Sequence, residues 1–238
     1  MKIGIKVFPH NITYIKEMVE HSDFIEVMAL KESDFSGLKD YDIPYVIHNM
    51  HSCWGVNFAN PEKSEFNKST LNFALQLADK INAKTIIAHP GLIENKECTN
   101  QSAIKFFNQF PDERIVIENM PYYSDKIVEM GKSFSEMKEI LDGTKKKMCL
   151  DFGHASASAV GLKQDQMTLI KQFIALKPKH FHFCDGIFDK PRDAHMNIGD
   201  GNYPLEEFKK LIPNDAWVTL ETPHGAKKQI NDINFLKR

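Results

Sequence analysis

The sequence has little cysteine and no long apolar segment. Only four cysteines occur among 238 residues, they lie far apart, and none belongs to a C-x-x-C pair. Such thiols, in a chain that shows no signal peptide, are typical of reduced cysteines, so we expect a cytoplasmic protein. No apolar run approaches the roughly 18 residues that a membrane-spanning helix needs. We therefore expect no membrane segment, and nothing in the sequence implies a protein partner.

The sequence also lacks a strong net charge and the glycine motifs of nucleotide-binding proteins. The net charge is −2 and the isoelectric point about 6.6, which excludes a global positive field that would attract nucleic acid or anionic membranes. No G-x-G-x-x-G or G-x-x-x-x-G-K-[ST] motif follows an apolar run. The chain does have 42% hydrophobic and 26% charged residues. This composition predicts one folded domain over residues 1–238.

Short apolar runs alternate along the chain with segments of helical spacing. Eight runs are predicted strands: Ile3–Val7, Phe24–Ala29, Tyr45–Ile47, Thr85–Ala88, Ile115–Ile117, Met148–Leu150, His180–Cys184 and Val218–Leu220. The predicted helices are Ile12–Glu20, Ser64–Ile81, Thr99–Phe110, Ser133–Leu141 (stopping at Gly143), Gln166–Leu176 and Leu205–Leu211. Strand–helix units of about 30 residues predict a closed (β/α)8 TIM barrel, with a doubly wound open sheet as the alternative.

Histidine and carboxylate residues gather where the predicted strands end. In a TIM barrel the chemistry lies at the carboxyl ends of the strands and in the loops that follow them. From the third strand onward these positions hold His48, His51, His89, Glu118, Asp151, His154, His182, Asp193, His195, Glu221 and His224. One histidine at a strand end is usually an ordinary polar residue. Seven histidines at one predicted rim indicate a shared function.

The carboxylates of this rim indicate a metal site. Glu118, Asp151, Asp193 and Glu221 would repel one another in a buried mouth unless they were protonated or neutralised by cations. Mixed imidazole and carboxylate ligands suit Zn, Mn, Fe or Co better than Ca or Mg. His180 lies two residues before His182, within the strand, and is interpreted as a core or supporting imidazole.

The rim motifs resemble those of a known enzyme family. They are HPG at His89, IEN at Glu118, LDFGHA at Asp151 and His154, HFCD at His182, DAHMNIGDG at Asp193 and His195, and LET at Glu221. Together they resemble the endonuclease IV family of apurinic/apyrimidinic endonucleases, within the xylose-isomerase-like TIM barrels. The resemblance covers nearly the whole chain. For the ligand from the third strand, His48 and His51 remain alternatives.

The resemblance implies up to three Zn²⁺ ions and a phosphodiester substrate. A first ion would bind the third-strand histidine, His89 and Glu118. A second would bind Glu118, Asp151, His182 and Glu221. A third would bind His154, Asp193 and His195. The implied reaction is attack of a metal-bridging hydroxide on damaged, abasic DNA.

The same superfamily contains single-metal sugar and sugar-phosphate isomerases and epimerases, which is the alternative function. Those enzymes use one Mn²⁺, Co²⁺ or Mg²⁺ on the positions of Glu118, Asp151, His182 and Glu221. In them Glu118 and Glu221 would act as the catalytic acid and base. They have no need of His89 or of Asp193 and His195, so the filled positions favour the hydrolase. A third possibility is a binding protein that keeps a relic of the metal site.

Three further residues are predicted to contact substrate. Trp54 lies in a rim loop, where an aromatic ring can stack on substrate or cap the barrel. Arg192 lies beside Asp193 and is the best phosphate ligand among the rim cations. His224 follows the last strand. The loops after the first and third strands hold no arginine that could wedge into a DNA duplex.

Overall fold

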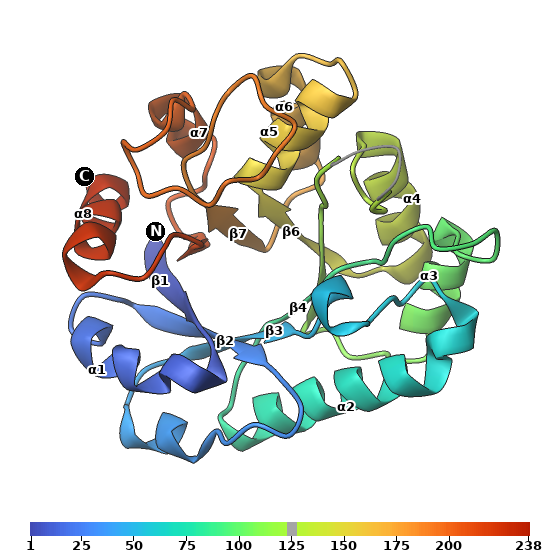
Figure 1. Cartoon of the computed structure of the whole chain (residues 1–238), viewed down its shortest axis with the longest axis horizontal. Helices are drawn as coiled ribbons and strands as arrows, with labels where there is room; N and C mark the ends of the chain where they lie inside the picture. Colours follow the sequence, from blue (N-terminus) through green and yellow to red (C-terminus); the bar gives the residue numbers. More distant parts are fainter. Residues whose placement is uncertain (123–127) are drawn as a thin grey trace.

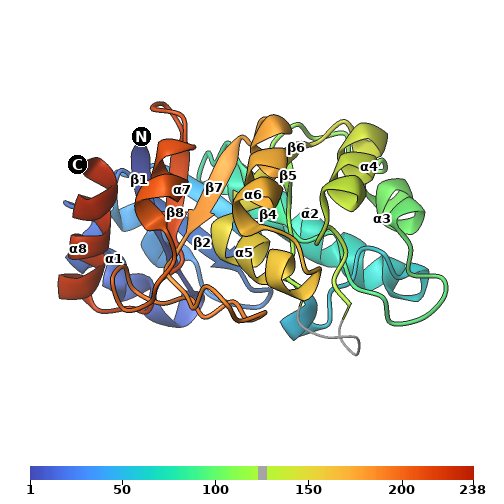
Figure 2. The same cartoon turned by 90° about the horizontal axis from the view of Figure 1, so that it is seen from above.

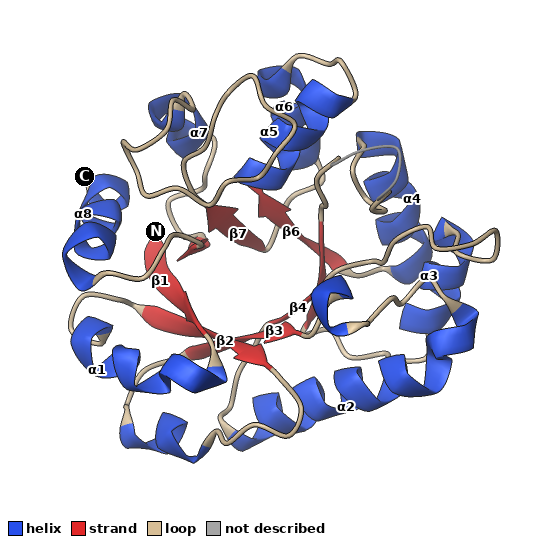
Figure 3. Cartoon of the chain, in the orientation of Figure 1, coloured by secondary structure: helices blue, strands red, loops and turns tan. Residues whose placement is uncertain are grey.

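A computed structural model describes residues 1–122 and 128–238. Eight parallel strands close into a barrel in the order β1 to β8, with β8 paired to β1 through Lys2 and Trp217 and through Ile5 and Leu220 (Figures 1 and 3). The strands are β1 Lys2–Val7, β2 Phe24–Ala29, β3 Tyr45–Asn49, β4 Ile86–Ala88, β5 Ile115–Glu118, β6 Lys147–Asp151, β7 His180–Phe183 and β8 Trp217–Leu220. The predicted TIM barrel is thus confirmed, and the open sheet is excluded.

Helices form a ring around the barrel (Figure 1). The α-helices are α1 Ile15–Met18, α2 Ser64–Lys80, α3 Asn100–Phe107, α4 Phe134–Thr144, α5 Phe152–Gly161, α6 Gln166–Ala175, α7 Leu205–Lys210 and α8 Ala226–Lys237. Short 3-10 helices are η1 Pro9–Tyr14, η2 Ser36–Asp40, η3 Ser52–Trp54 and η4 Pro61–Lys63. In the described part of the chain, no helix is long and apolar enough to cross a membrane.

Three predicted helix bounds are wrong. The helix predicted to run to Phe110 ends at Phe107. The segment predicted as one helix from Ile12 to Glu20 is mostly the 3-10 helix η1, and only Ile15–Met18 is α-helical. Helix α4 does not stop at Gly143 but continues to Thr144. A Cβ atom at Gly143 would lie 2.7 Å from Cδ1 of Ile104, so this glycine allows α3 and α4 to approach each other. The helices α5 and α8 were not predicted from the sequence.

Alternate residues of each strand point into the barrel. The floor is an apolar layer with one residue from each of six strands: the buried Phe24, Val46, Ile87, Val116 and Cys149, and the partly buried Trp217. Gly4 completes this layer, because a Cβ atom there would lie 2.5 Å from the ring of Phe24. Two positions further along the chain from these six residues are Glu26, His48, His89, Glu118, Asp151 and Thr219, of which His89 directly follows β4. The strand register therefore places a polar layer directly above an apolar floor.

The loops that follow the strands lie together on one side of the barrel. In Figure 2 the N-terminus lies at the upper edge, whereas the long orange loop between β7 and α7 lies at the lower edge. The polar layer opens toward that second side, which we call the mouth. The predicted metal ligands belong to strand ends and loops of the mouth, except His154, which lies in the first turn of α5.

Candidate metal centre

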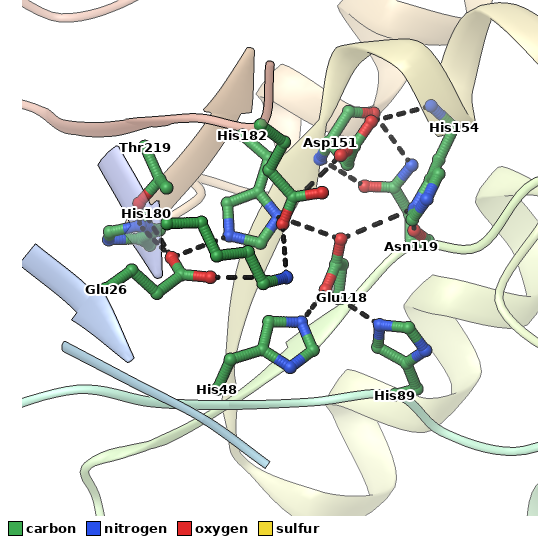
Figure 4. Close-up of polar contacts among 12 residues, drawn as sticks. Glu26, His48, His89, Glu118, Asn119, Asp151, His154, His180, His182 and Thr219 are labelled. Atoms are coloured by element: carbon green, nitrogen blue, oxygen red, sulfur yellow. Dashed lines mark hydrogen bonds and ion pairs between the residues drawn. The ribbon is translucent and has the colours of Figure 1, made fainter. Parts of the chain in front are cut away.

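Glu118, the last residue of β5, lies at the centre of the histidine cluster. Its Oε2 atom is 3.2 Å from Nε2 of His48 and 3.1 Å from Nε2 of His89. Its Oε1 atom is 2.9 Å from Nδ1 of His182 and 3.3 Å from Nδ1 of His154 (Figure 4). Burial raises the pKa of Glu118, but the positive charges of His182 and His89 outweigh burial and hold this pKa well below its ordinary value. Glu118 is therefore an ionised carboxylate within reach of four imidazoles.

His182 on β7 is surrounded by carboxylates on both ring nitrogens. Its Nδ1 atom lies 2.9 Å from Oε1 of Glu118, 3.1 Å from Oε1 of Glu221 and 3.7 Å from Oδ2 of Asp151. Burial lowers the pKa of His182, but the surrounding acidic groups raise it well above the ordinary value. The pKa of Glu221 is lowered to about 2, because the charges of His182 and Lys6 outweigh the effect of burial. Three carboxylates thus converge on one ring nitrogen.

A second cluster forms beside Glu118 from the start of α5 and the loop after β7. Asp151 caps α5 by accepting a hydrogen bond from the backbone N–H of His154. This cap places His154 in the first turn, where its Nε2 atom lies 3.5 Å from Oδ2 of Asp193. The same carboxylate oxygen contacts Nε2 of His195. His195 has a left-handed backbone with φ 45°, which is unusual outside glycine, and its Nδ1 atom reaches Oε2 of Glu221 at 3.3 Å.

The loop that carries Asp193 and His195 is held by the carboxylate of Asp185. Its Oδ1 atom accepts the backbone N–H groups of Gly186 at 2.8 Å and Tyr203 at 3.1 Å. Its Oδ2 atom accepts those of Gly199 at 2.9 Å and Gly201 at 3.0 Å. A Cβ atom at Gly201 would lie 2.6 Å from Oδ1 of Asp185, so only glycine allows this close approach. Asp185 therefore fixes the loop at both of its ends.

The donor set fits one or more divalent cations. Among the described residues, His48, His89 and Glu118 form one group whose ligand atoms lie within 4.8 Å of one another, as do Glu118, Asp151 and His154, and also His154, Asp193 and His195. Two buried atoms of these residues have no hydrogen-bond partner: Oδ2 of Asp151 and Nδ1 of His89. A buried acceptor without a donor is costly, and a cation would satisfy the carboxylate oxygen of Asp151. Imidazole with carboxylate suits Zn²⁺ or a similar transition metal.

Both histidines of the third-strand segment lie beside His89. His48, inside the barrel, reaches Glu118, and its Nδ1 atom lies 2.9 Å from the carbonyl oxygen of Asn49. His51 lies higher in the mouth, with its ring stacked on that of His89 at 4.7 Å. Trp54 packs edge-on against His51 at 4.5 Å and so braces this histidine. The arrangement leaves both histidines as candidate ligands.

A pocket of about 1000 Å³ opens above the clusters. Its lining includes His51, His89, Glu118, His154, His195, Glu221 and His224, together with apolar Phe8, Met28, Leu92, Met120 and Pro223. Trp54 and Arg192 are not among the lining residues, and Arg192 is exposed. Of the predicted substrate-binding residues, the structure therefore brings His224 into the pocket, places Trp54 behind His51 and leaves Arg192 outside.

Three ionisable residues of the site were missing from the sequence-based prediction. Lys6 on β1 lies 2.5 Å from Oε1 of Glu221 and 3.5 Å from Oε1 of Glu26 on β2. Glu129 lines the pocket, and burial raises its pKa to about 7. Lys6 and Glu26 could have been found from the sequence, because each is a charged residue at an inward-pointing position of a largely apolar strand. Glu129 lies in a loop, where no such pattern indicates its direction.

An eight-stranded parallel barrel with histidines and carboxylates at its mouth defines the class of this protein. A model of the family described as xylose isomerase-like TIM barrel matches residues 36–238. The chain belongs to this family, as predicted.

Similar proteins come from two branches of this class. The probable endonuclease 4 of Mycoplasmopsis synoviae is 25% identical over 229 residues, which cover 89% of this chain and 82% of that protein. The structure of endonuclease IV from Thermus thermophilus matches with a TM-score of 0.73 at 17% identity, covering 100% of this chain and 98% of that one. A D-tagatose 3-epimerase-like protein matches with a TM-score of 0.77 at 17% identity, covering 100% and 96%. At these identities the structural matches establish the fold.

Proposed function

We propose that this protein is a metal-dependent phosphodiester hydrolase that acts on abasic DNA, as its resemblance to endonuclease IV implies. The observation that carries the proposal is the cluster of His154, Asp193 and His195 beside the Glu118 group. A single-metal isomerase has no use for this third group of ligands. The 25% identity to a probable endonuclease 4 supports the same choice.

In this proposal His48 or His51, with His89 and Glu118, holds the first Zn²⁺. Glu118, Asp151, His182 and Glu221 hold the second, and His154, Asp193 and His195 hold the third. Bound zinc would activate water and neutralise the charge that develops on the phosphate. The carboxylate oxygens of Glu118 lie 2.9 to 3.3 Å from a ring nitrogen of at least one histidine in each of these three proposed zinc sites. Glu118 therefore links the three sites. His224 at the pocket rim would contact substrate.

The test compares wild type with His195→Ala on an oligonucleotide duplex containing one abasic site, at low salt, where phosphate contacts are strongest. Strand cleavage by wild type should need zinc and be lost in the variant. His21→Ala is the control, because His21 is exposed and precedes β2 at the opposite end of the barrel. Elemental analysis should give about three zinc ions per wild-type chain and fewer in His195→Ala. A wild-type chain that leaves abasic DNA intact under these conditions contradicts the proposal.

The composition of the pocket favours a second candidate, a sugar or sugar-phosphate isomerase or epimerase with one Mn²⁺, Co²⁺ or Mg²⁺. Among the described lining residues, Lys6 is the only lysine or arginine, and it is paired with Glu221 and Glu26. A pocket without a free cation suits an uncharged sugar better than a sugar phosphate. Glu118 and Glu221 would then move the protons. In that case wild type turns over a ketose with one metal ion per chain, and His195→Ala retains this activity.

A further inference from the structure

A buried carboxylate below the metal centre contacts His182 from the side opposite to the candidate ligands. Glu26, on β2, is completely buried. Its Oε2 atom lies 3.0 Å from Nε2 of His182 and accepts the hydroxyl of Thr219 at 2.7 Å (Figure 4). The Nε2 atom of His180 lies 3.4 Å from the same oxygen. Glu26 does not line the pocket, but its carboxylate lies within 4.8 Å of ligand atoms of His182 and Glu221.

The two ring nitrogens of His182 face different surroundings. Nδ1 faces Glu118, Glu221 and Asp151. Together with His182, these are the residues proposed to bind the second metal ion, and we call them the second ligand set. Nε2 faces Glu26 alone among the carboxylates of the described residues. A histidine that binds a metal through one nitrogen commonly donates the proton on its other nitrogen to a carboxylate, which fixes the tautomer and makes the ring a stronger ligand.

We propose that Glu26 is a positioning residue that holds the proton of His182 on Nε2 and thereby presents Nδ1 to the metal ion of the second ligand set. The proposal rests on the proposed metal centre but not on its substrate. It applies equally to a hydrolase and to a single-metal isomerase, because both use His182.

The neighbours of Glu26 keep its carboxylate in place. The Nζ atom of Lys6 lies 3.5 Å from Oε1 of Glu26, and Oε1 has no hydrogen-bond partner. The lysine therefore supplies the charge that makes a buried carboxylate tolerable, since an unpaired one would be very costly. The same ammonium group lies 2.5 Å from Oε1 of Glu221. Lys6 thus links Glu26, which faces Nε2 of His182, to Glu221, which faces Nδ1 of the same ring.

Removing the charge of Glu26 should weaken metal binding without unfolding the protein. Glu26→Gln keeps the size of the side chain and can still accept one hydrogen bond, but it no longer attracts the Nε2 proton by charge. Loss of such a partner typically costs 10- to 100-fold in metal affinity. The metal-free variant should still fold, because Lys6 keeps Glu221 as its ion-pair partner at 2.5 Å.

The first experiment uses the wild-type protein loaded with Zn²⁺. Long-range ¹H–¹⁵N correlation spectra distinguish the two imidazole nitrogens, and the signal of His182 is the one that His182→Gln lacks. We expect the proton on Nε2 and zinc on Nδ1. The opposite arrangement would overturn the proposal, and this measurement does not depend on any variant at Glu26.

The second experiment measures zinc affinity by competition with a chelating dye. Glu26→Gln should release the zinc ion that depends on His182 at a 10- to 100-fold lower chelator concentration than wild type. In this variant the Nε2 proton of His182 should also resonate at higher field, because its hydrogen bond is weaker. Glu94→Gln is the matched control, because this carboxylate is bound by Asn60 and Lys63. Equal zinc affinity of Glu26→Gln and wild type overturns the role of Glu26 alone. A wild-type chain that binds no zinc overturns the metal centre as well.

Discussion

The imidazole rings of His51 and His89 are stacked with their centroids 4.7 Å apart and their planes inclined by 21°. The ring of His48 meets His89 from another side, edge-on at 5.1 Å. The barrel thus offers three imidazoles to one cation beside Glu118. Only two of them, His48 and His89, have a ring nitrogen in contact with Glu118 among the described contacts.

This geometry predicts that His48→Ala weakens zinc binding more than His51→Ala. Nδ1 of His48 faces the carbonyl oxygen of Asn49, so Nε2 is free to face the metal, as is usual for a ligating histidine. Chelator competition on both variants measures the difference, which we expect to be about tenfold. A larger loss in His51→Ala would identify His51 as the ligand and leave His48 as a packing residue.

Glu118→Gln should be the most damaging single substitution at the site. It keeps the shape of the side chain but removes the charge that faces four histidines. Both candidate functions need this carboxylate, as a shared ligand or as an acid–base group, so activity of either kind should fall at least ~100-fold. Cleavage of abasic DNA and turnover of a ketose, measured on the same preparation, check the prediction. A variant that stays active with its metal bound would show that Glu118 is not a functional ligand.

Asp185→Ala should destabilise the fold and disturb the third group of ligands together. The substitution leaves four backbone N–H groups without their carboxylate. Unsatisfied donors of this kind should lower the free energy of unfolding by about 3–5 kcal/mol. Because the loop carries Asp193 and His195, the metal ion proposed for this group should be the first to be lost.

Urea unfolding and elemental analysis measure the two effects of Asp185→Ala. The matched control is Asp189→Ala, an exposed aspartate in the same loop, which should change neither. Full stability with a normal metal content in Asp185→Ala would show that the loop holds its shape without this carboxylate.

The sequence predicted the barrel because its strands are short, continuous apolar runs, whereas in its helices the apolar residues recur every three or four positions. Fully buried runs such as Phe24–Ala29 and the stripe of Ser64–Ile81 are strong local signals. The bounds of α4 were harder to predict, because Gly143 fits a helix that packs closely on Ile104. Tertiary contact decided that position, and a local rule could not. Whether residues 1–238 behave as one domain stays a prediction.

The candidate site was predictable where motifs stand at strand ends and was missed in the strand interiors. Glu26 and Lys6 lie in strands whose other residues are largely apolar, so only counting by two from Phe24 and Gly4 indicates that they point inward. The sequence also could not separate Trp54, which braces His51, from a substrate-stacking residue. Side-chain direction within a loop depends on neighbours that lie far away in the sequence.

Glu129 should make the stability of the metal-free protein fall as the pH rises. Burial raises its pKa from 4.5 to about 7, so between these values the folded protein keeps a proton that the unfolded chain has lost. A folded state that binds more protons loses stability as the pH increases. The loss begins near pH 4.5 and is complete above pH 7, where it should reach about 1–3 kcal/mol.

The amide of Glu129→Gln stays neutral at every pH in this range, so the variant should be more stable than wild type at about pH 8. The two proteins should converge toward about pH 4, because there the carboxyl is protonated in both states of the wild type. Denaturant unfolding with a chelator present, at several pH values, measures the difference. Glu97→Gln removes an exposed carboxylate and should leave the pH profile of wild type unchanged. A difference between Glu129→Gln and wild type that stays constant across this pH range would contradict a raised pKa at Glu129.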